Sequence, residues 1–358
     1  MSRYFTTSKE YWQYLRRLRS APPPSANANQ ARRGTFSAAL EQSEQLFSAA
    51  SSVGAEATPI LLYYGTYQAG RAIAAANPDT RMPWQLQGHG LKAPNLSDRD
   101  RVAPTQRQNL MNMTVRSTGR TPEAYPTISS ILNSAPLTEA VELGDLVSLL
   151  DETGTRTATG GSSLFPSLSN KPRPLAVDIE VLATRNGVDI VTLKGAPPDL
   201  LSAEEPDTSV EEFIRKFFPQ FDQQWEIDAR AGKKSPRYKN SIHLSRRGEI
   251  DTTREPFDER DDDRLALERA LNIRRPYYGF SDVIDPTLPS QKTGIHRLCL
   301  WWAVLYHLSM VARYTPNAWT ADLDVDNSSL AVGLEQLLEL AFEEVPQIVG
   351  EVISDFHA

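Results

Sequence analysis

Residues 58–92 read TPILLYYGTYQAGRAIAAANPDTRMPWQLQGHGLK, and this stretch decides the fold that the sequence predicts. Thr58 is a favoured N-cap residue, and Pro59 suits the first helical position, where a missing N–H costs nothing. Asn77 precedes Pro78, and a residue before proline disfavours the helical conformation. We therefore predict one helix of about five turns, at 3.6 residues per turn, between these bounds.

The two faces of this helix differ in character. At about 100° per residue, Leu62, Ala69 and Ile73 share one face. The polar and aromatic residues share roughly the opposite face, namely Tyr64, Tyr67, Gln68 and Arg71. A glycine inside a helix costs about 1 kcal/mol relative to alanine. Gly65 and Gly70 therefore indicate that neighbouring helices approach closely.

A loop with a glycine on each side of His89 follows the helix and leads to Lys92. Arginine binds carboxylate or phosphate through a planar fork, and glycines allow the backbone to approach a ligand. We predict that Tyr64, Gln68 and Arg71 line a polar pocket with this loop. The alternative is that Arg71 pairs with an internal carboxylate and the tyrosines only pack.

Composition favours a globular protein. The chain has 358 residues, 40% hydrophobic and 23% charged, so one large or two modest domains are expected. The net charge of -7 gives no global reason to expect nucleic-acid coating. The single cysteine, Cys299, excludes an internal disulfide and fits a reducing cytosol. The first residues lack a basic segment followed by an apolar run, so no signal peptide is expected and the predicted localisation is cytoplasmic.

Segment 295–314, IHRLCLWWAVLYHLSMVARY, is the strongest membrane candidate. Its apolar run stops at His307 and Arg297 stands at its start, whereas a span needs about 20 mostly apolar residues. We therefore predict a buried helix and no membrane partner. Pro316 ends it, and a last helix at 329–356 contains Pro346 as the site of a kink.

The rest of the chain predicts helices at 8–19 and 31–52, a long loop at 93–126 and short helical pieces at 127–150. A Gly/Ser/Thr-rich connection at 153–169 precedes alternating residues that flank Asn186-Gly187, which indicates a β-hairpin. Helices at 209–218 and 265–273 follow. The predicted fold class is mainly α with a small β-hairpin insertion (α+β) around a helical bundle core. The predicted domains are 1–152, a helical part with the His-Gly loop, 153–290, an α+β insertion with charged loops, and 291–358, helices that complete the core.

Three charged segments can be interpreted either as functional sites or as charged surface loops. The loop at 93–126 holds Arg99, Arg101, Arg107, Arg116 and Arg120, either as a phosphate-contacting arm or as a solvated surface. The basic block 230–247 and the acidic block 251–263 are adjacent, which is typical of a salt-bridged surface loop. The aspartates of the acidic block are mostly consecutive, whereas calcium loops place ligands at alternate positions.

The sequence contains few recognisable catalytic motifs. The chain has no Walker A loop, GxGxxG, GxSxG, HExxH or CxxC pair, and its histidines lack metal-ligand spacing. No cofactor or metal is therefore predicted. Arg237 and His243 fit the loose Arg-x(4-6)-His spacing of HEPN-type ribonucleases. Those enzymes place the motif on a helix, whereas Gly232 and Pro236 indicate a loop here.

Two segments resemble the YaaC-like family of bacterial proteins. The first is PILLYYGTYQAGRAIAAANP followed by GHG, with Tyr64, Gly65, Gln68, Ala72, His89 and Gly90. The second is LYHLSMVARYTPNAW, with Tyr306, Leu308, Ser309, Met310, Ala312, Arg313, Tyr314 and Trp319. The resemblance covers about 36–346 and is thin from 93 to 289. It implies kinship and no particular reaction.

The two segments lead to one structural hypothesis, that their helices pack side by side. This would place Arg71 and Arg313 near one pocket with His89 at its mouth, which indicates an anionic ligand such as a nucleotide or RNA phosphate. The predicted ligand-binding residues are Tyr64, Gln68, Arg71, His89, Lys92, Tyr306 and Arg313. The alternatives are a phosphodiester-cleaving effector that uses His89 or His243 as acid or base, and a purely structural helical scaffold. The oligomeric state is not readable from the sequence.

Overall fold

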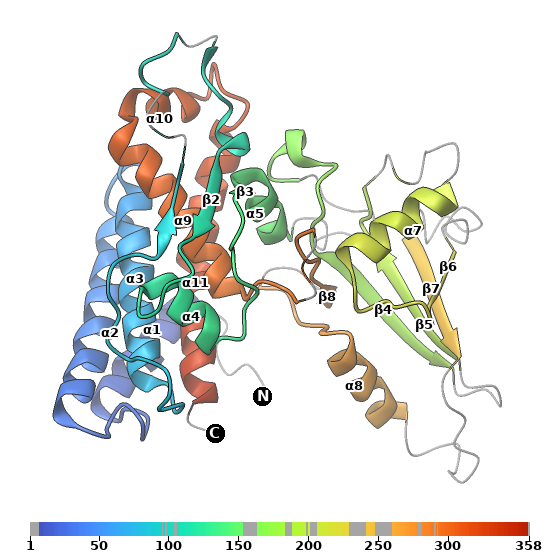
Figure 1. Ribbon diagram of the computed structural model, residues 1–358, viewed down its shortest axis with the longest axis horizontal. Helices are drawn as coiled ribbons and strands as arrows, with labels where there is room; N and C mark the ends of the chain where they lie inside the picture. The colour runs from blue at the N-terminus through green and yellow to red at the C-terminus, as the bar shows by residue number, and fades with distance from the viewer. Residues whose placement is uncertain are drawn as a thin grey trace. The chain divides into compact units, whose positions relative to one another are not determined.

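The computed structural model describes residues 7–94, 96, 99–103, 106–152, 163–182, 188–197, 200, 206–228, 241–247, 260–277, 281–289, 291 and 293–356 (Figure 1). The chain divides into two compact units. The helical unit comprises Met1–Val147 and Ile295–Ala358, and the sheet unit comprises Ser148–Gly294. The domain boundaries predicted from the sequence, at 152/153 and 290/291, stay a prediction.

The described residues contain ten α-helices and two sheets, of three and five strands. The protein is therefore mixed α+β, with helix in the majority. The predicted small hairpin was wrong in extent, because the sheet unit is built on five strands.

Helix α3 lies at the centre of the helical unit. It contacts α2, α4, α9 and α11, and α1 packs against α2 and α11 (Figure 1). The helices of this unit are α1 (Ser8–Ser20), α2 (Gln30–Ala50), α3 (Thr58–Ala76), α4 (Ala124–Ile131), α9 (Arg297–Tyr314), α10 (Pro316–Asp322) and α11 (Ala331–Asp355). Pro346 lies inside α11.

The ends of α3 follow the sequence, with one correction. Pro59 occupies the first turn, and Asn77 leaves the helix with φ −60° and ψ 126°. The predicted N-cap was wrong, because the Oγ1 of Thr58 donates 2.9 Å to the carbonyl of Gly54 and caps no amide of the helix. At the other end, Arg32 of α2 donates to the carbonyls of Ala75 and Asn77, which α3 itself leaves unbonded.

The two glycines of α3 are contact points, as predicted. A Cβ on Gly65 would lie 2.6 Å from the ring of Phe47 on α2. A Cβ on Gly70 would lie 2.2 Å from the indole of Trp302 on α9. Each glycine thus allows a buried aromatic ring to lie directly against the helix backbone.

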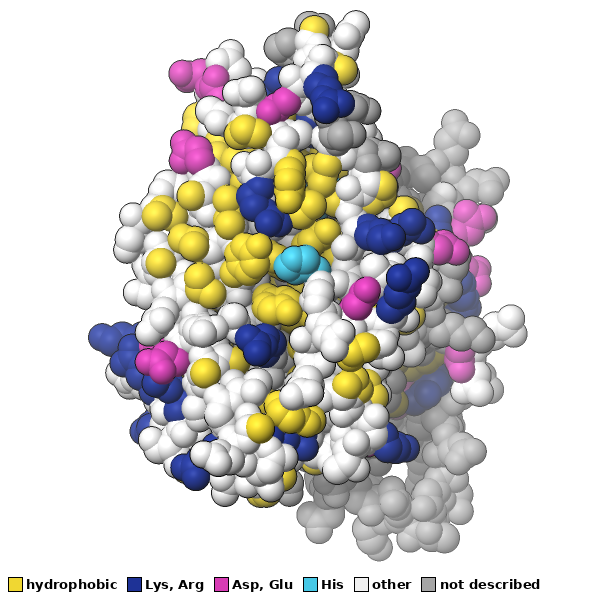
Figure 2. Space-filling model, turned by 60° about the vertical axis from the view of Figure 1, so that its left-hand side comes forward, with side chains coloured by type: hydrophobic (Ala, Val, Ile, Leu, Met, Phe, Trp, Pro, Cys, Tyr) yellow, Lys and Arg dark blue, Asp and Glu magenta, His cyan; other side chains and the backbone are white. Residues whose placement is uncertain are grey.

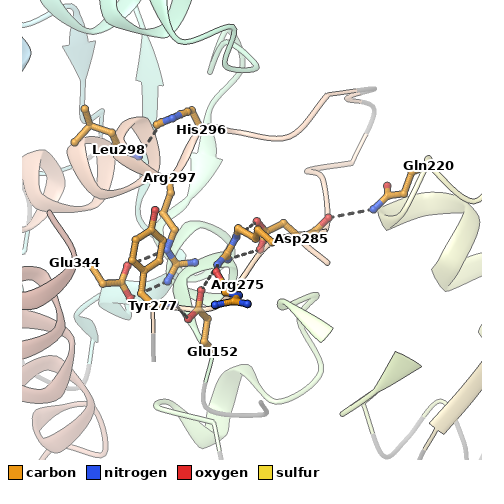
Figure 3. A network of polar contacts seen from close by, with 10 residues as sticks. Glu152, Gln220, Arg275, Tyr277, Asp285, His296, Arg297, Leu298 and Glu344 are labelled. Carbon is orange, nitrogen blue, oxygen red and sulfur yellow. Dashed lines mark hydrogen bonds and ion pairs between the residues drawn. The ribbon is translucent and has the colours of Figure 1, made fainter. Parts of the chain in front are cut away.

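A buried ion pair joins α9 to α11. The Nε and Nη2 of Arg297 lie 2.8 and 2.9 Å from the two oxygens of Glu344 (Figure 3). The indole N–H of Trp301 donates 2.7 Å to the same carboxylate. Arg297 is 8% exposed and Glu344 is 1% exposed. The carboxylate of Glu344 therefore compensates the positive charge of Arg297, which the fold removes from water. At the start of α9, the Nδ1 of His296 accepts from the amide of Leu298 (Figure 3).

A small antiparallel sheet follows α3. Its strands are β1 (Leu91–Lys92), β2 (Thr114–Ser117) and β3 (Val141–Glu142), in the order β1-β2-β3, and α5 (Leu143–Leu150) follows directly. A short 3₁₀ helix, η2 (Leu110–Asn112), precedes β2. The prediction of one long loop at 93–126 was therefore wrong in part. A four-residue strand with Val115 and Ser117 inward carries too short an alternation to be recognised in sequence.

The sheet unit contains one antiparallel sheet in the order β6-β7-β5-β4-β8. Its strands are β4 (Leu175–Leu182), β5 (Val188–Lys194), β6 (Glu226–Asp228), β7 (Ser241–Arg247) and β8 (Val283–Ile284), with η4 (Pro166–Leu168), α7 (Pro206–Phe217) and α8 (Arg260–Ala270) alongside. The predicted hairpin is the pair β4 and β5, whose turn Asn186-Gly187 lies outside the described residues.

One face of this sheet carries the core of the unit. Val177 pairs with Leu193, and Leu193 pairs with Ile242, so their side chains share a face. Phe213 of α7 and Leu267 of α8 belong to the same buried cluster. The interpretation of 230–247 as a charged loop was wrong for Ser241–Arg247, which is strand β7 with Ile242 and Leu244 inward. Arg246 takes the next position of the same parity, so the apolar alternation covers only two residues.

An ion-pair network lies within the sheet unit (Figure 3). Arg274 contacts Glu152 at 2.7 Å and both oxygens of Asp285 at 2.5 and 2.6 Å. Glu152 also accepts 2.9 Å from the amide of Tyr277. Because Glu152 is fully buried, its charge is stabilised by these contacts and ties distant parts of the unit together.

Candidate anion-binding site

Helices α3 and α9 lie side by side, as the sequence predicted, and run in opposite directions. At one level, Arg313 of α9 contacts Tyr64 of α3, and at another Trp302 of α9 packs on Gly70 of α3. Later residues of α3 therefore face earlier residues of α9. This places the polar face of α3 beside the last turns of α9.

The loop that carries His89 is fixed against this helix pair. Its backbone is held by two hydrogen bonds, from the amide of Tyr125 to the carbonyl of His89 at 3.1 Å and from the amide of Thr118 to that of Gly90 at 2.9 Å. Gly90 has φ +77°, and a Cβ there would lie 2.3 Å from the ring of Pro126. Only glycine fits this close turn, which positions the exposed imidazole.

Four tyrosines surround the imidazole of His89. The ring centroids lie 5.7 Å away for Tyr63 and Tyr67, 6.3 Å for Tyr306 and 6.4 Å for Tyr64. Tyr63 also forms a 2.6 Å hydrogen bond between its hydroxyl and the Nδ1 of His89. We call these five residues the tyrosine–histidine cluster.

The hydrogen bond to Tyr63 assigns the tautomer of His89. Tyr63 is fully buried, and burial raises the pKa of its hydroxyl, so the group stays protonated. A buried O–H needs an acceptor, and Nδ1 of His89 is the one at hydrogen-bond distance. The histidine proton is then on Nε2, which leaves that N–H for a ligand or solvent.

His89 is held in its neutral form. Partial burial against the tyrosines lowers its pKa from 6.5, and the positive charge of Arg313 lowers it further. At pH 7 the neutral imidazole therefore predominates. An anion bound beside Arg313 would offset that charge and raise the pKa of His89.

Arg313 is the central cation of the site. Its Cζ lies 5.7 Å from the ring centroid of Tyr64 and 5.3 Å from that of Tyr314, and its Nη1 donates 3.2 Å to the hydroxyl of Tyr64. Its remaining hydrogen bonds go to the carbonyl of Ser309 and the sulfur of Met310. Within the part of the chain that the structure describes, no carboxylate neutralises this guanidinium.

Arg71 and Gln68 lie further along α3. The Nη1 of Arg71 donates 3.2 Å to the side chain of Gln68, and its charge also acts on the hydroxyl of Tyr67. Arg71 is seven residues from Tyr64, or roughly 10 Å at 1.5 Å per residue. Arg313 thus contacts Tyr64, and the charge of Arg71 acts on Tyr67. Both of these tyrosines pack against the imidazole of His89.

Two predicted residues have different surroundings. Tyr306 is only 5% exposed and donates 3.0 Å from its hydroxyl to the carbonyl of Leu91, so it positions the strand after the His-Gly loop. Lys92 is exposed on β1, where its Cα partner across the strand pair is Arg116. The structure therefore brings Tyr64, His89, Tyr306 and Arg313 together. Lys92 lies three residues after His89 in the chain.

The structure also places two other residues that the sequence suggested as functional, Arg99 and His243. Arg99, for which the sequence allowed a phosphate-contacting arm or a solvated surface, is 2% exposed and pairs with Asp322 at 2.8 and 3.1 Å, so neither interpretation holds for this residue. His243 lies on β7 with its Nδ1 3.3 Å from the hydroxyl of Thr192. Arg237 lies outside the described residues, so the HEPN-type pairing stays untested.

Tyr63 and Tyr314 were not among the predicted ligand-binding residues. Tyr63 supports His89 from a fully buried position, and Tyr314 is 62% exposed against the guanidinium of Arg313. The available signal was their adjacency to Tyr64 and Arg313. Adjacent helical positions point about 100° apart, so adjacency alone did not place them in the same cluster.

Figure 2 shows a face of the molecule on which one histidine lies among side chains coloured as hydrophobic, a class that includes tyrosine. Lysine or arginine side chains lie above, below and to the right of it in that view, and acidic side chains are fewer there. The described residues contain no group of three or more His, Cys, Asp or Glu that could hold a metal ion. None of the described helices has the length and apolar character of a membrane span.

Comparison with known proteins identifies the family. A model of the family described as "YaaC-like Protein" matches residues 3–353. The chain therefore belongs to the YaaC-like family, as the two sequence segments indicated. No curated protein and no solved structure gave a match to it.

Proposed function

We propose that this protein binds a phosphate-bearing aromatic ligand of the nucleotide class at the tyrosine–histidine cluster and Arg313. The observation that carries the proposal is the state of Arg313, a half-buried guanidinium between two tyrosine rings without a carboxylate among the described residues. Guanidinium groups bind phosphate through paired hydrogen bonds and stack on flat rings.

The contrast with other arginines supports this proposal. Arg297 and Arg99, which are more deeply buried, each have a carboxylate at 2.8 Å. Two structural arginines of the unit are thus neutralised by an internal acid, whereas buried Arg32 donates to the backbone carbonyls of Ala75 and Asn77. Arg313 and Arg71 also direct their charge to neutral partners, so the local charge remains positive and suits an anion.

The rings provide the second half of the recognition. Tyr64 and Tyr67 are partly exposed, and His89 is exposed and neutral. A neutral imidazole with its proton on Nε2 can donate one hydrogen bond to a phosphate oxygen while its Nδ1 stays with Tyr63. Aromatic faces beside it offer stacking for a base, which is worth about 1–3 kcal/mol per base.

Calorimetric titration of the purified chain with AMP, adenosine and inorganic phosphate tests the proposal. AMP is expected to bind more tightly than either part alone. Arg313→Gln is expected to weaken AMP about tenfold or more, since hydrogen bonds to charged groups contribute about 1.5–3 kcal/mol. Arg33→Gln is the matched control, because Arg33 is an exposed arginine of α2 in the same unit.

Three results would count against the proposal. Absence of heat with AMP, GMP, CMP and UMP at millimolar concentration would remove the nucleotide class. Equal affinities for AMP in Arg313→Gln and in the Arg33→Gln control would show that Arg313 is not the phosphate contact. Adenosine binding as tightly as AMP would remove the phosphate from the recognition.

A further inference from the structure

A second cationic feature begins three residues after His89. Lys92 of β1 and Arg116 of β2 are direct partners across the antiparallel pair, and both are exposed. Side chains of directly opposite residues have Cβ atoms about 4.5–5.5 Å apart, and like charges in this position are destabilising. The fold therefore keeps two positive charges together at a cost to the sheet.

Two acidic residues of this region, Glu123 and Glu142, have other neighbours. Glu123 accepts from the hydroxyl of Thr118, and Glu142 lies opposite Thr114, two residues along β2 from Arg116. Among the described residues neither Lys92 nor Arg116 forms an ion pair. The positive charge of the pair is thus available to something outside the chain.

The pair is rigidly connected to the His89 loop. The carbonyl of Leu91 accepts from Tyr306, and that of Gly90 accepts from the amide of Thr118. Three residues span at most about 10 Å of extended chain. The Cα of Lys92 therefore lies within about 10 Å of the Cα of His89. The backbone between them is held by the hydrogen bonds to the carbonyls of Gly90 and Leu91.

We propose that Lys92 and Arg116 form a second phosphate subsite, so that the ligand of the cluster is a single-stranded oligonucleotide. This inference rests on the proposed function and names its substrate class. Proteins that bind single strands combine cations that follow the backbone with aromatic side chains that stack on bases. Here Arg313 and the tyrosine–histidine cluster hold one nucleotide, and the Lys92–Arg116 pair contacts a neighbouring phosphate of the same strand.

The test compares ligands of increasing length. Fluorescence anisotropy measures labelled rA6, dA6 and a twelve-base-pair DNA duplex, with AMP as an unlabelled competitor of each. Both hexamers are expected to bind at least tenfold more tightly than AMP, and AMP is expected to displace them. The double variant Lys92→Gln/Arg116→Gln is expected to lose most of that advantage while its affinity for AMP stays unchanged.

Salt dependence gives an independent reading of the same contacts. For single strands, the slope of log K against log salt changes by about 0.7 per phosphate contact. Loss of this one phosphate contact is expected to make the slope shallower by about 0.7. Lys9→Gln/Arg33→Gln is the control, because it removes two exposed cations of α1 and α2 and is expected to leave the slope unchanged.

The failures of the two proposals can be told apart. Tight AMP binding with no gain for rA6 or dA6, or with an unchanged salt slope in Lys92→Gln/Arg116→Gln, would overturn the oligonucleotide inference and leave the proposed function in place. Absence of binding by AMP and by both hexamers would overturn both proposals. Binding of the duplex in preference to the hexamers would also overturn the inference, since stacking on the cluster needs unpaired bases.

Discussion

The Nη1 of Arg313 lies 3.2 Å from the hydroxyl of Tyr64, across 249 positions of the chain. This contact joins the last turn of α9 to the middle of α3 and holds a guanidinium over a partly exposed ring. It also differs from the pair of Arg297 and Glu344, where a buried carboxylate neutralises the arginine. The contact of Arg313 with Tyr64 leaves a positive charge at the surface, whereas Glu344 neutralises the charge of Arg297 in the core.

Tyr64 is expected to act mainly through its ring. Tyr64→Phe removes the acceptor of the Arg313 hydrogen bond and keeps the stacking face, so AMP affinity is expected to fall by no more than about fivefold, which corresponds to about 1 kcal/mol. Tyr64→Leu removes the ring and is expected to cost about 1–3 kcal/mol of binding. Calorimetric titration of both variants checks the order, and equal losses would contradict a stacking role.

Gly70→Ala is expected to destabilise the helical unit. The added Cβ would lie 2.2 Å from the Trp302 ring, and both residues are buried, so overpacking of about 1–3 kcal/mol outweighs the gain in helix propensity. Gly34→Ala on α2 is the matched control, with nothing within 4 Å of the new Cβ, and is expected to stabilise by up to about 1 kcal/mol. Urea unfolding measures both, and a Gly70→Ala variant as stable as the parent would contradict the packing described.

Breaking the buried pair of α9 and α11 is expected to be costly. Glu344→Ala removes the carboxylate that the Nε and Nη2 of Arg297 contact and is expected to lower the free energy of unfolding by about 3–5 kcal/mol. Arg297→Met/Glu344→Leu removes both charges and is expected to recover most of this loss. Chemical denaturation of the two variants provides the comparison. A double variant less stable than Glu344→Ala would show that the charges themselves stabilise the unit.

Stability is expected to fall as the pH drops below 6.5. Burial, with a smaller contribution from the charge of Arg99, lowers the pKa of His307 to about 3, and burial lowers that of His296 to about 4. Below the unfolded pKa of about 6.5 the unfolded chain takes up protons that the folded chain excludes. Each such histidine therefore removes up to about 1.4 kcal/mol per pH unit, down to its folded pKa.

His307→Leu isolates one of these histidines. Neither ring nitrogen of His307 has a hydrogen-bond partner within the described structure, so leucine removes a buried polar group as well as a titration. The variant is expected to lose stability less steeply between pH 6.5 and pH 5. Unfolding curves at several pH values give the slope. An unchanged slope would mean that His307 is protonated in the folded chain.

The sequence predicted the parts of the fold that local chemistry determines. Pro59 and the Asn77-Pro78 pair bound α3, and Gly65 and Gly70 indicated close helix packing before any partner was known. The identities of those partners, Phe47 and Trp302, could not be read, because nothing local distinguishes them from other buried aromatic residues. Thr58 was misjudged because its hydroxyl meets the carbonyl of Gly54 before any free amide of the helix.

The missed features depend on contacts between distant residues. Ser241–Arg247 forms a strand because Ile242 and Leu244 complete the core of the sheet unit, and two apolar residues among cations give no clear pattern alone. Arg99 and Arg313 look alike in sequence. One meets Asp322 in the folded chain, and the other meets Tyr64. Which arginine stays available for a ligand is therefore decided by tertiary structure.

The most direct test of the central claim is the ¹⁵N NMR spectrum of the His89 side chain, assigned with His89→Gln, during titration with AMP. The free protein is expected to show a neutral imidazole with its proton on Nε2 and a pKa below 6.5. Saturating AMP is expected to move these signals and to raise that pKa in the parent and in Arg33→Gln, and to do neither in Arg313→Gln. His89 signals that stay unchanged at saturating AMP would contradict the assignment of this cluster as the anion site.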